Sequence, residues 1–175
     1  MTTESPRDSI FAGRVLTAMA NRVSLELVAF SSWMLLGFGA ILGLALANIE
    51  TVSKFVAPES LGLAVKLFLV AVVFNVLQRY MAAIVSASVT LGKEVEALPI
   101  DPNLDMASFS RQIEGATFWP MKLMVRWSNR KIAGGDFAVG GRLTARLAQV
   151  QAWFVLVQVI AVLAAALVIA NALQG

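Results

Sequence analysis

Apolar residues recur in three long stretches of the chain, each close to the length that a membrane-spanning helix requires. The hydrocarbon core of a bilayer is about 30 Å thick, which about 20 apolar residues in a helix can cross. The stretches cover residues 25–49, 61–92 and 152–173. The pattern predicts an all-α integral membrane protein with three transmembrane helices.

The polar content of the predicted spans differs. The first contains one acid, Glu26, near its beginning, and the third contains only the amides Gln158 and Asn171. The second is longer than a span requires and contains Arg79, so its register is open. Residues 61–80 would leave Arg79 near one surface, whereas residues 67–91 would place it nearer the middle of the membrane. We favour one long, tilted helix over residues 61–92.

The segments between and before the spans predict additional helices at the membrane surface. Residues 1–24 have apolar residues at helical spacing between arginines, which predicts an amphipathic interfacial helix before the chain turns into the membrane. Residues 50–60 form a short external loop. Residues 93–151 form a long, partly interfacial segment with a short helix at about 106–116 and a hinge at the sequence GGDFAVGGR.

A short sequence echo links the approaches to the first and third spans. Residues 13–18 read GRVLTA and residues 141–145 read GRLTA. A few residues do not establish a duplication, and we interpret them as two similar lead-ins that enter the membrane from the same side.

Composition supports a membrane location and excludes several kinds of chemistry. The chain is 58% hydrophobic and 14% charged, against about 45–50% and about 25% in soluble domains. It contains no cysteine and no histidine. This removes disulfides, the commonest metal ligands and the usual general base. We therefore expect a protein that is not an enzyme, with no catalytic or metal site and no cofactor.

Lysine and arginine are distributed unevenly between the two sides of the three-span topology. Eleven basic residues fall in the N-terminal segment and the long segment 93–151, whereas one, Lys54, falls in the loop 50–60. Basic residues near span ends remain in the cytoplasm. The expected location is a cell membrane, taken to be a bacterial inner membrane, with the N-terminus cytoplasmic and the C-terminus external.

Polar residues inside the spans are the first candidates for function: Glu26, Asn75, Arg79 and Gln158. Arg79 is the most informative, because an arginine at mid-membrane costs about 2.5–3.5 kcal/mol. It either snorkels to the inner headgroups beside Tyr80, which we favour, or pairs with Glu26 or a ligand or partner. Gln151 and Gln158, seven residues apart, are placed to hydrogen-bond across helices.

Two further sets of residues are candidates for packing and anchoring. Small residues form one face of the first span, which predicts close helix packing within the chain or with another chain: Ser32, Gly39, Gly43 and Ala47. Aromatic and basic residues alternate in FWPMKLMVRW, which predicts an interfacial anchor: Trp119, Lys122, Arg126 and Trp127. The same stretch is also compatible with a re-entrant segment or a docking surface.

Together these features favour a non-catalytic accessory or structural subunit of a larger membrane complex. The expected partners are anionic lipid headgroups and other membrane subunits or copies of the chain itself, and no nucleic acid. The alternative is a homo-oligomeric channel lined by the polar face of the second span, and a membrane enzyme is the third choice.

Overall fold

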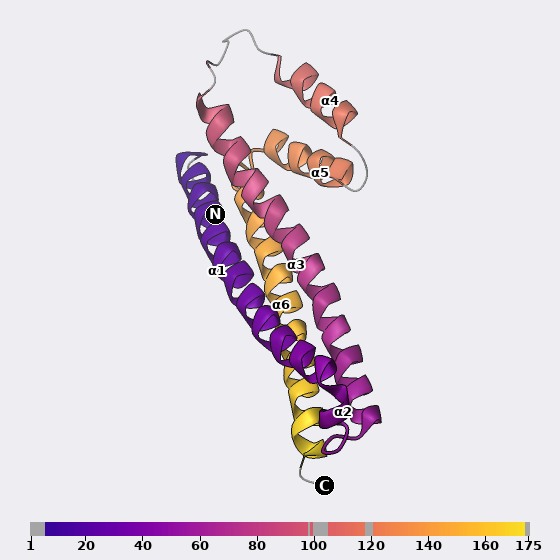
Figure 1. Ribbon diagram of the computed structural model, residues 1–175. Coiled ribbons are helices and arrows are strands. Elements are labelled where there is room, and N and C mark those ends of the chain that lie inside the picture. Colours follow the sequence, from indigo (N-terminus) through magenta and orange to yellow (C-terminus); the bar gives the residue numbers. More distant parts are fainter. Residues whose placement is uncertain (1–5, 98, 100–104, 118–120, 174–175) are drawn as a thin grey trace. The chain divides into compact units, whose positions relative to one another are not determined.

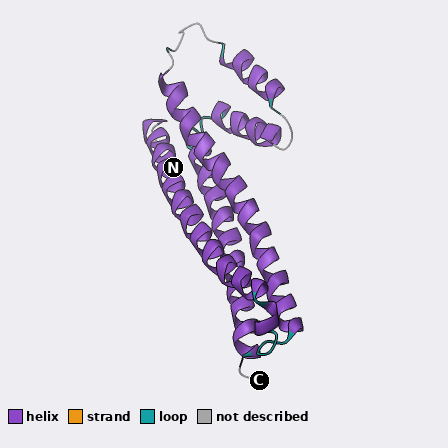
Figure 2. Cartoon of the chain, viewed as in Figure 1, coloured by secondary structure: helices purple, strands orange, loops and turns teal. Residues whose placement is uncertain are grey.

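The computed structural model describes residues 6–97, 99, 105–117 and 121–173, which form helices and connecting turns with no strand (Figure 2). In chain order the helices are α1 (Pro6–Ala47), α2 (Ile49–Val52), α3 (Pro58–Ala97), α4 (Met106–Ala116), α5 (Met121–Ala133) and α6 (Val139–Ala172) (Figure 1). Among them α1, α3 and α6 are long and apolar enough to cross a membrane. The all-α fold with three candidate spans is confirmed.

Helix boundaries agree with local sequence signals at several positions. Pro6 and Pro58 each begin a long helix, where the missing N–H of proline costs nothing. Gly135 follows α5, where the connection to α6 begins, and has φ +86°. Its N–H donates to Ile132 O at 2.9 Å and the Asp136 N–H donates to Lys131 O at 3.0 Å, which is a Schellman motif. The predicted hinge therefore begins as a helix cap.

The long helices extend beyond the predicted segment boundaries. We expected the chain to turn between the interfacial segment 1–24 and the first span, but α1 is unbroken from Pro6 to Ala47. The third span likewise begins inside a longer helix, because α6 starts at Val139. The short helix predicted at 106–116 is present as α4, and residues 49–52 of the predicted external loop form α2.

The chain divides into two compact units. The first comprises Met1–Asn21 and Ser86–Arg146, and the second comprises Arg22–Val85 and Leu147–Gly175. In the second unit, α1 and α6 run in the same direction and α3 runs antiparallel to them. Two apolar clusters establish this order, one around Leu42, Leu61 and Ile169 and the other around Leu35, Ala71 and Val162.

Buried positions of the second unit follow a heptad pattern. In α6 they alternate by three and four residues: Ala148, Gln151, Val155, Gln158, Val162 and Ala165. In α3 the same spacing links most buried residues: Leu61, Ala64, Ala71, Gln78, Ala82 and Val85. This spacing is typical of left-handed helical bundles, in which the same stripe keeps facing the neighbouring helices.

In the first unit, α1 and α6 meet at two glycines that lie within the sequence echo. A Cβ at Gly141 would overlap the backbone of Gly13, and a Cβ at Gly13 would lie 3.2 Å from Ala138 Cα. Only residues without side chains permit such a close approach of two helix backbones. The echo therefore coincides with a glycine-to-glycine helix contact.

Adding a methyl group at two adjacent glycines of α6 should have opposite effects. Gly141→Ala places its Cβ against the Gly13 backbone, which should lower the stability by about 1–3 kcal/mol. Gly140→Ala, whose Cβ would meet nothing within 4 Å, should be neutral or stabilise by up to about 1 kcal/mol through helix propensity. Thermal unfolding midpoints in mild detergent measure both effects, and equal shifts would contradict the close contact.

Candidate functional site

A stripe of polar residues faces the interior of the three-helix second unit. Each helix contributes two members: Ser24 and Ser31 from α1, Asn75 and Gln78 from α3, and Gln151 and Gln158 from α6. Five of them are buried and Asn75 is half-buried. Spacings of seven or three residues keep each pair on the stripe that faces the other helices. We call these six residues the polar layer.

Ser31 is the centre of the polar layer. Its hydroxyl oxygen lies 2.8 Å from Gln158 Oε1 and 2.8 Å from Asn75 Oδ1. Gln78 Nε2 lies 3.2 Å from both Ser31 Oγ and Asn75 Oδ1. Because a hydroxyl carries one hydrogen, Ser31 can donate to only one of these two oxygens. We assign its hydrogen to Gln158, while Gln78 donates from Nε2 to both Ser31 Oγ and Asn75 Oδ1. One serine thus links all three helices.

Gln151 extends the network about two helical turns further along the bundle. Its Nε2 donates to Gln78 Oε1 at 3.0 Å and to the backbone oxygen of Ser24 at 3.1 Å. Gln158 makes the equivalent backbone contact, donating from Nε2 to Ser31 O at 3.4 Å. Both α6 amides therefore bond to α1 at positions that are seven residues apart, which aligns the two helices over one heptad, or about two helical turns.

Two buried atoms of the polar layer have no hydrogen-bond partner within the part of the chain that the structure describes. They are Ser24 Oγ and Gln151 Oε1. Burying a hydroxyl or amide oxygen without a partner costs about 1–3 kcal/mol. The layer is therefore uneven, because Ser31 is fully bonded whereas the Ser24 hydroxyl lies unpaired at the edge of the network.

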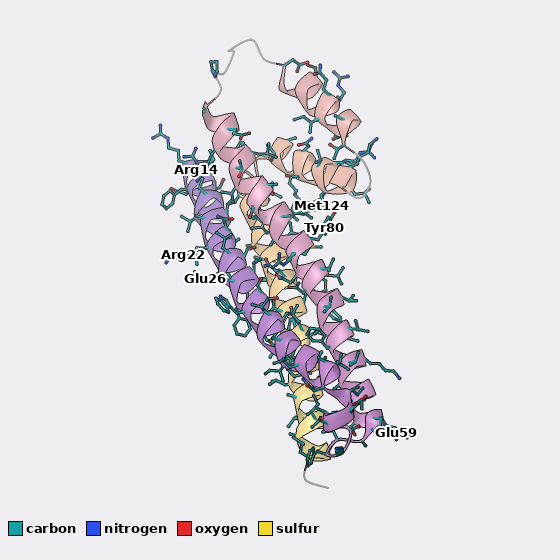
Figure 3. The ribbon with its side chains drawn as sticks, viewed as in Figure 1. Arg14, Arg22, Glu26, Glu59, Tyr80 and Met124 are labelled. Carbon is teal, nitrogen blue, oxygen red and sulfur yellow. The ribbon has the colours of Figure 1, made fainter. Side chains whose placement is uncertain are left out.

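The residues predicted to be polar within the spans lie in different surroundings. Asn75 and Gln158 belong to the polar layer, whereas Glu26 lies on the outer surface (Figure 3). Arg79 is also exposed. Arg79 donates from Nη2 to Ser32 Oγ at 2.7 Å, and that hydroxyl donates in turn to Val28 O at 2.6 Å. Among the described residues no ion pair joins Glu26 to Arg79. Ser32, rather than Glu26, is therefore the hydrogen-bond partner of Arg79.

The predicted small-residue face of α1 separates into an inner and an outer part. Gly39 faces α3, since a Cβ there would lie 3.0 Å from the ring of Phe68. A Cβ at Gly43 would meet nothing within 4 Å, and Ala47 is exposed. Ser32, the remaining member, holds Arg79. Two residues of this face, Ser32 and Gly39, therefore contact α3, while Gly43 and Ala47 are uncovered.

The predicted interfacial anchor lies partly on α5. Trp119 falls outside the described residues, while Lys122, Arg126 and Trp127 lie on α5 and are exposed. Arg126 forms an ion pair with Glu114 of α4 at 3.6 Å. Arg126, one of the basic residues of the predicted anchor, therefore joins α5 to α4.

Sequence reasoning identified Gln158, Gln151 and Asn75 but did not assign roles to Ser24, Ser31 and Gln78. The missing signal was the common spacing. Ser24 and Ser31 are seven residues apart along α1 and Gln151 and Gln158 are seven apart along α6, so each pair occupies one heptad stripe, although Ser24 and Gln151 fall just outside the predicted spans. Searching each span for polar residues at heptad positions would have found the layer.

The polar layer is built from groups that form hydrogen bonds. The layer consists of hydroxyls and amides, with no charged member. Within the described ranges, no group of His, Cys, Asp or Glu is placed to hold a metal ion. Comparison of the chain with known protein families, curated proteins and solved structures found no match.

Two serines of α1 provide a matched test of the polar layer, because both are fully buried and seven residues apart. Ser31→Ala leaves Gln158 and Gln78 with a lost partner and should destabilise the bundle by about 1–3 kcal/mol. Ser24→Ala removes a hydroxyl without a partner and should be neutral or stabilising. Unfolding midpoints in mild detergent give the comparison, and a larger loss for Ser24→Ala would refute the network.

Proposed function

We propose that this chain is a non-catalytic accessory or structural subunit of a larger membrane protein complex, which contacts its partner through the open face of α1. The observation that carries the proposal is the difference between the inner and outer surfaces of the three helices. Their polar side chains are used inside the bundle, while Gly43 and its neighbours remain uncovered. A bundle that keeps most of its amides and hydroxyls inside is suited to packing against other helices in lipid.

Three exposed aromatic residues suggest where the second unit meets one membrane surface. They are Trp33, Tyr80 and Trp153, with exposed fractions of 75%, 52% and 66%. Each is within two residues of a member of the polar layer. The three helices lie side by side at this level, because Ser32 bonds to Arg79 and Gln151 bonds to Gln78. Tryptophan and tyrosine with this exposure are typical of the membrane interface. The polar layer then lies near one edge of the membrane.

Helix length supports this placement. At about 1.5 Å per residue, the three helices continue roughly 20–35 Å from the aromatic level to their far ends, which is close to the hydrocarbon thickness of about 30 Å. Those ends are Ala47, Pro58 and Ala172. Arg79, next to Tyr80 and exposed, lies at the interface in this arrangement and reaches the headgroups by snorkelling.

The open face of α1 has the shape that favours helix association. Its exposed small residues are Gly37, Ala40, Gly43 and Ala47, and nothing lies within 4 Å of a Cβ built at Gly37 or Gly43. Small residues let a second helix approach closely, which increases dispersion contacts where lipid provides no hydrophobic drive. The larger residues Leu36 and Leu44 are exposed on the same stretch of α1.

The alternative, a homo-oligomeric pore lined by the polar face of α3, has less support. That face would require Asn75 and Arg79 to point together toward a shared water path. Instead Asn75 accepts a hydrogen bond from Gln78 inside the bundle, and Arg79 bonds to Ser32 on the outside. The polar residues of α3 are divided between two surroundings.

The proposed orientation places the N-terminus and the segment containing α4 and α5 in the cytoplasm, with the C-terminus external. It rests on the excess of lysine and arginine in those segments. The exposed Lys122 and Trp127 of α5 would then contact anionic headgroups of the inner leaflet.

Two exposed glycines provide the test of the docking face. Gly43→Ile fills the groove on α1 and should weaken partner association by at least about tenfold, which is about 1.4 kcal/mol. Gly62→Ile is the control, because a Cβ at that position of α3 also meets nothing within 4 Å. Co-purification from membranes in mild detergent, quantified by mass spectrometry, measures the effect. Equal retention of unlike subunits by both variants would contradict the proposed face.

The absence of native cysteine allows the partner to be identified by crosslinking. A single cysteine at Gly43, crosslinked in intact membranes, should give adducts with unlike chains, whereas a cysteine at Gly62 should not. Homodimeric adducts alone would instead assign the face to copies of this chain and would count against the accessory role.

A further inference from the structure

The exposed face of α1 extends well beyond the surface around Gly43. Exposed residues follow one line along the helix at alternating spacings of four and three residues: Arg22, Glu26, Ala29, Trp33, Leu36, Ala40, Gly43 and Ala47. We call these eight residues the outer stripe. Because α1 is one unbroken helix, a partner helix that packs on Gly43 with left-handed geometry would remain on the outer stripe as far as Arg22.

Two opposite charges lie at one end of the outer stripe. Arg22 and Glu26 are both exposed and are about one helical turn apart on α1 (Figure 3). Neither side chain has an ion pair or a hydrogen bond with another residue in the part of the chain that the structure describes. A charge that is covered without an opposite charge is costly, so a helix that lies on this end of the stripe must supply one of each sign.

The position of the two charges favours a protein surface over a lipid surface. At about 1.5 Å per residue, they lie roughly 10–17 Å along α1 from Trp33, on its N-terminal side. With Trp33 at the interface, as proposed above, both charges are outside the hydrocarbon. Anionic headgroups would attract Arg22 but repel Glu26, so lipid complements only one of them. A protein can complement both.

A second copy of the chain complements the two charges poorly. Copies in one membrane share an orientation, so two α1 helices would pack parallel, and a symmetric interface uses the same patch on both copies. Arginine would then lie level with arginine and glutamate with glutamate, and only the diagonal contacts between the helices would join opposite charges. A helix from an unlike chain has no such restriction.

We propose that the partner subunit contributes a helix that lies along the outer stripe and continues past the membrane surface, with an acidic residue opposite Arg22 and a basic residue opposite Glu26. The inference rests on the proposed accessory role, because it specifies the partner of the same face of α1. The small residues Ala40, Gly43 and Ala47 permit close approach of the two helices. The charges select the partner and its register, since a wrong helix or a shifted one brings like charges together.

Exchanging the two charges tests this pattern in the full chain, expressed in membranes together with its partner. The partner measured is the unlike chain whose recovery in mild detergent falls in Gly43→Ile but not in Gly62→Ile. Arg22→Glu combined with Glu26→Arg should lower its recovery about tenfold or more, because both positions then face like charges. The exchange leaves the net charge unchanged, so the unfolding midpoint should also be unchanged.

The control for the exchange is Lys93→Glu combined with Glu94→Lys, which reverses two exposed charges on α3 and should leave recovery of the partner unchanged. An equal loss in this control would show a diffuse dependence on charge and would overturn the proposal. Retained recovery in the α1 exchange would overturn it as well. If Gly43→Ile alone loses the partner, the docking face stands without the charge pattern, and if neither variant loses it, the accessory role fails too.

A crosslink without a spacer locates the acid of the partner. Arg22→Lys keeps the positive charge and provides an amine, which a water-soluble carbodiimide joins to a carboxylate in contact with it as an amide, while the carbodiimide takes up the released water as its urea. In intact membranes, peptide mass spectrometry should find this position joined to an Asp or Glu of the unlike chain. The native amine of Lys93 is the control and should not form this adduct. Adducts between copies of this chain alone, equal adducts from Lys93, or no adduct with an unlike chain would each refute the proposal.

Discussion

The second unit depends on one constraint, which is that polar groups buried among membrane-spanning helices must find partners among themselves. Lipid offers no hydrogen bonds, so each unpaired amide or hydroxyl there is costly. Ser31 meets this constraint by contacting Asn75, Gln78 and Gln158 at once. Any slip of one helix by a turn would separate these groups. The hydrogen bonds therefore fix the register, while the apolar contacts supply most of the buried area.

Register matters here because the apolar part of the bundle is weakly specific. Alanine, valine and leucine fill the interior on both sides of the polar layer, and such residues pack acceptably in several alignments. In water, burial of apolar area would still favour one compact arrangement, but between helices in lipid that drive is missing. A few amides at heptad positions then carry more of the specificity than their number suggests, as a buried asparagine does in a coiled coil.

The fold class could be predicted from sequence because length and hydropathy act within a single helix. The three apolar stretches and the short helix at 106–116 needed no knowledge of neighbours. The helix boundaries were less accurate, since nothing in residues 20–26 breaks a helix although hydropathy changes there, and α6 continues through the glycines Gly140 and Gly141. The partner of Arg79 was also not predictable. Opposite charge suggested Glu26, yet side-chain direction on two crossing helices brings Ser32 to it.

The glycines show why identical sequence signals can have different consequences. A glycine is informative only through what lies opposite its missing Cβ. Gly141 faces the backbone of another helix, Gly39 faces an aromatic ring, and Gly43 faces open space. The GxxxG pattern at Gly39 and Gly43 thus combines an internal contact with an external surface, which sequence spacing alone could not separate. The strongest backbone contact is instead made at Gly13 and Gly141, which are 128 positions apart in the chain. Close packing between two helices is therefore better inferred from small residues on two segments that run in the same direction than from a motif within one.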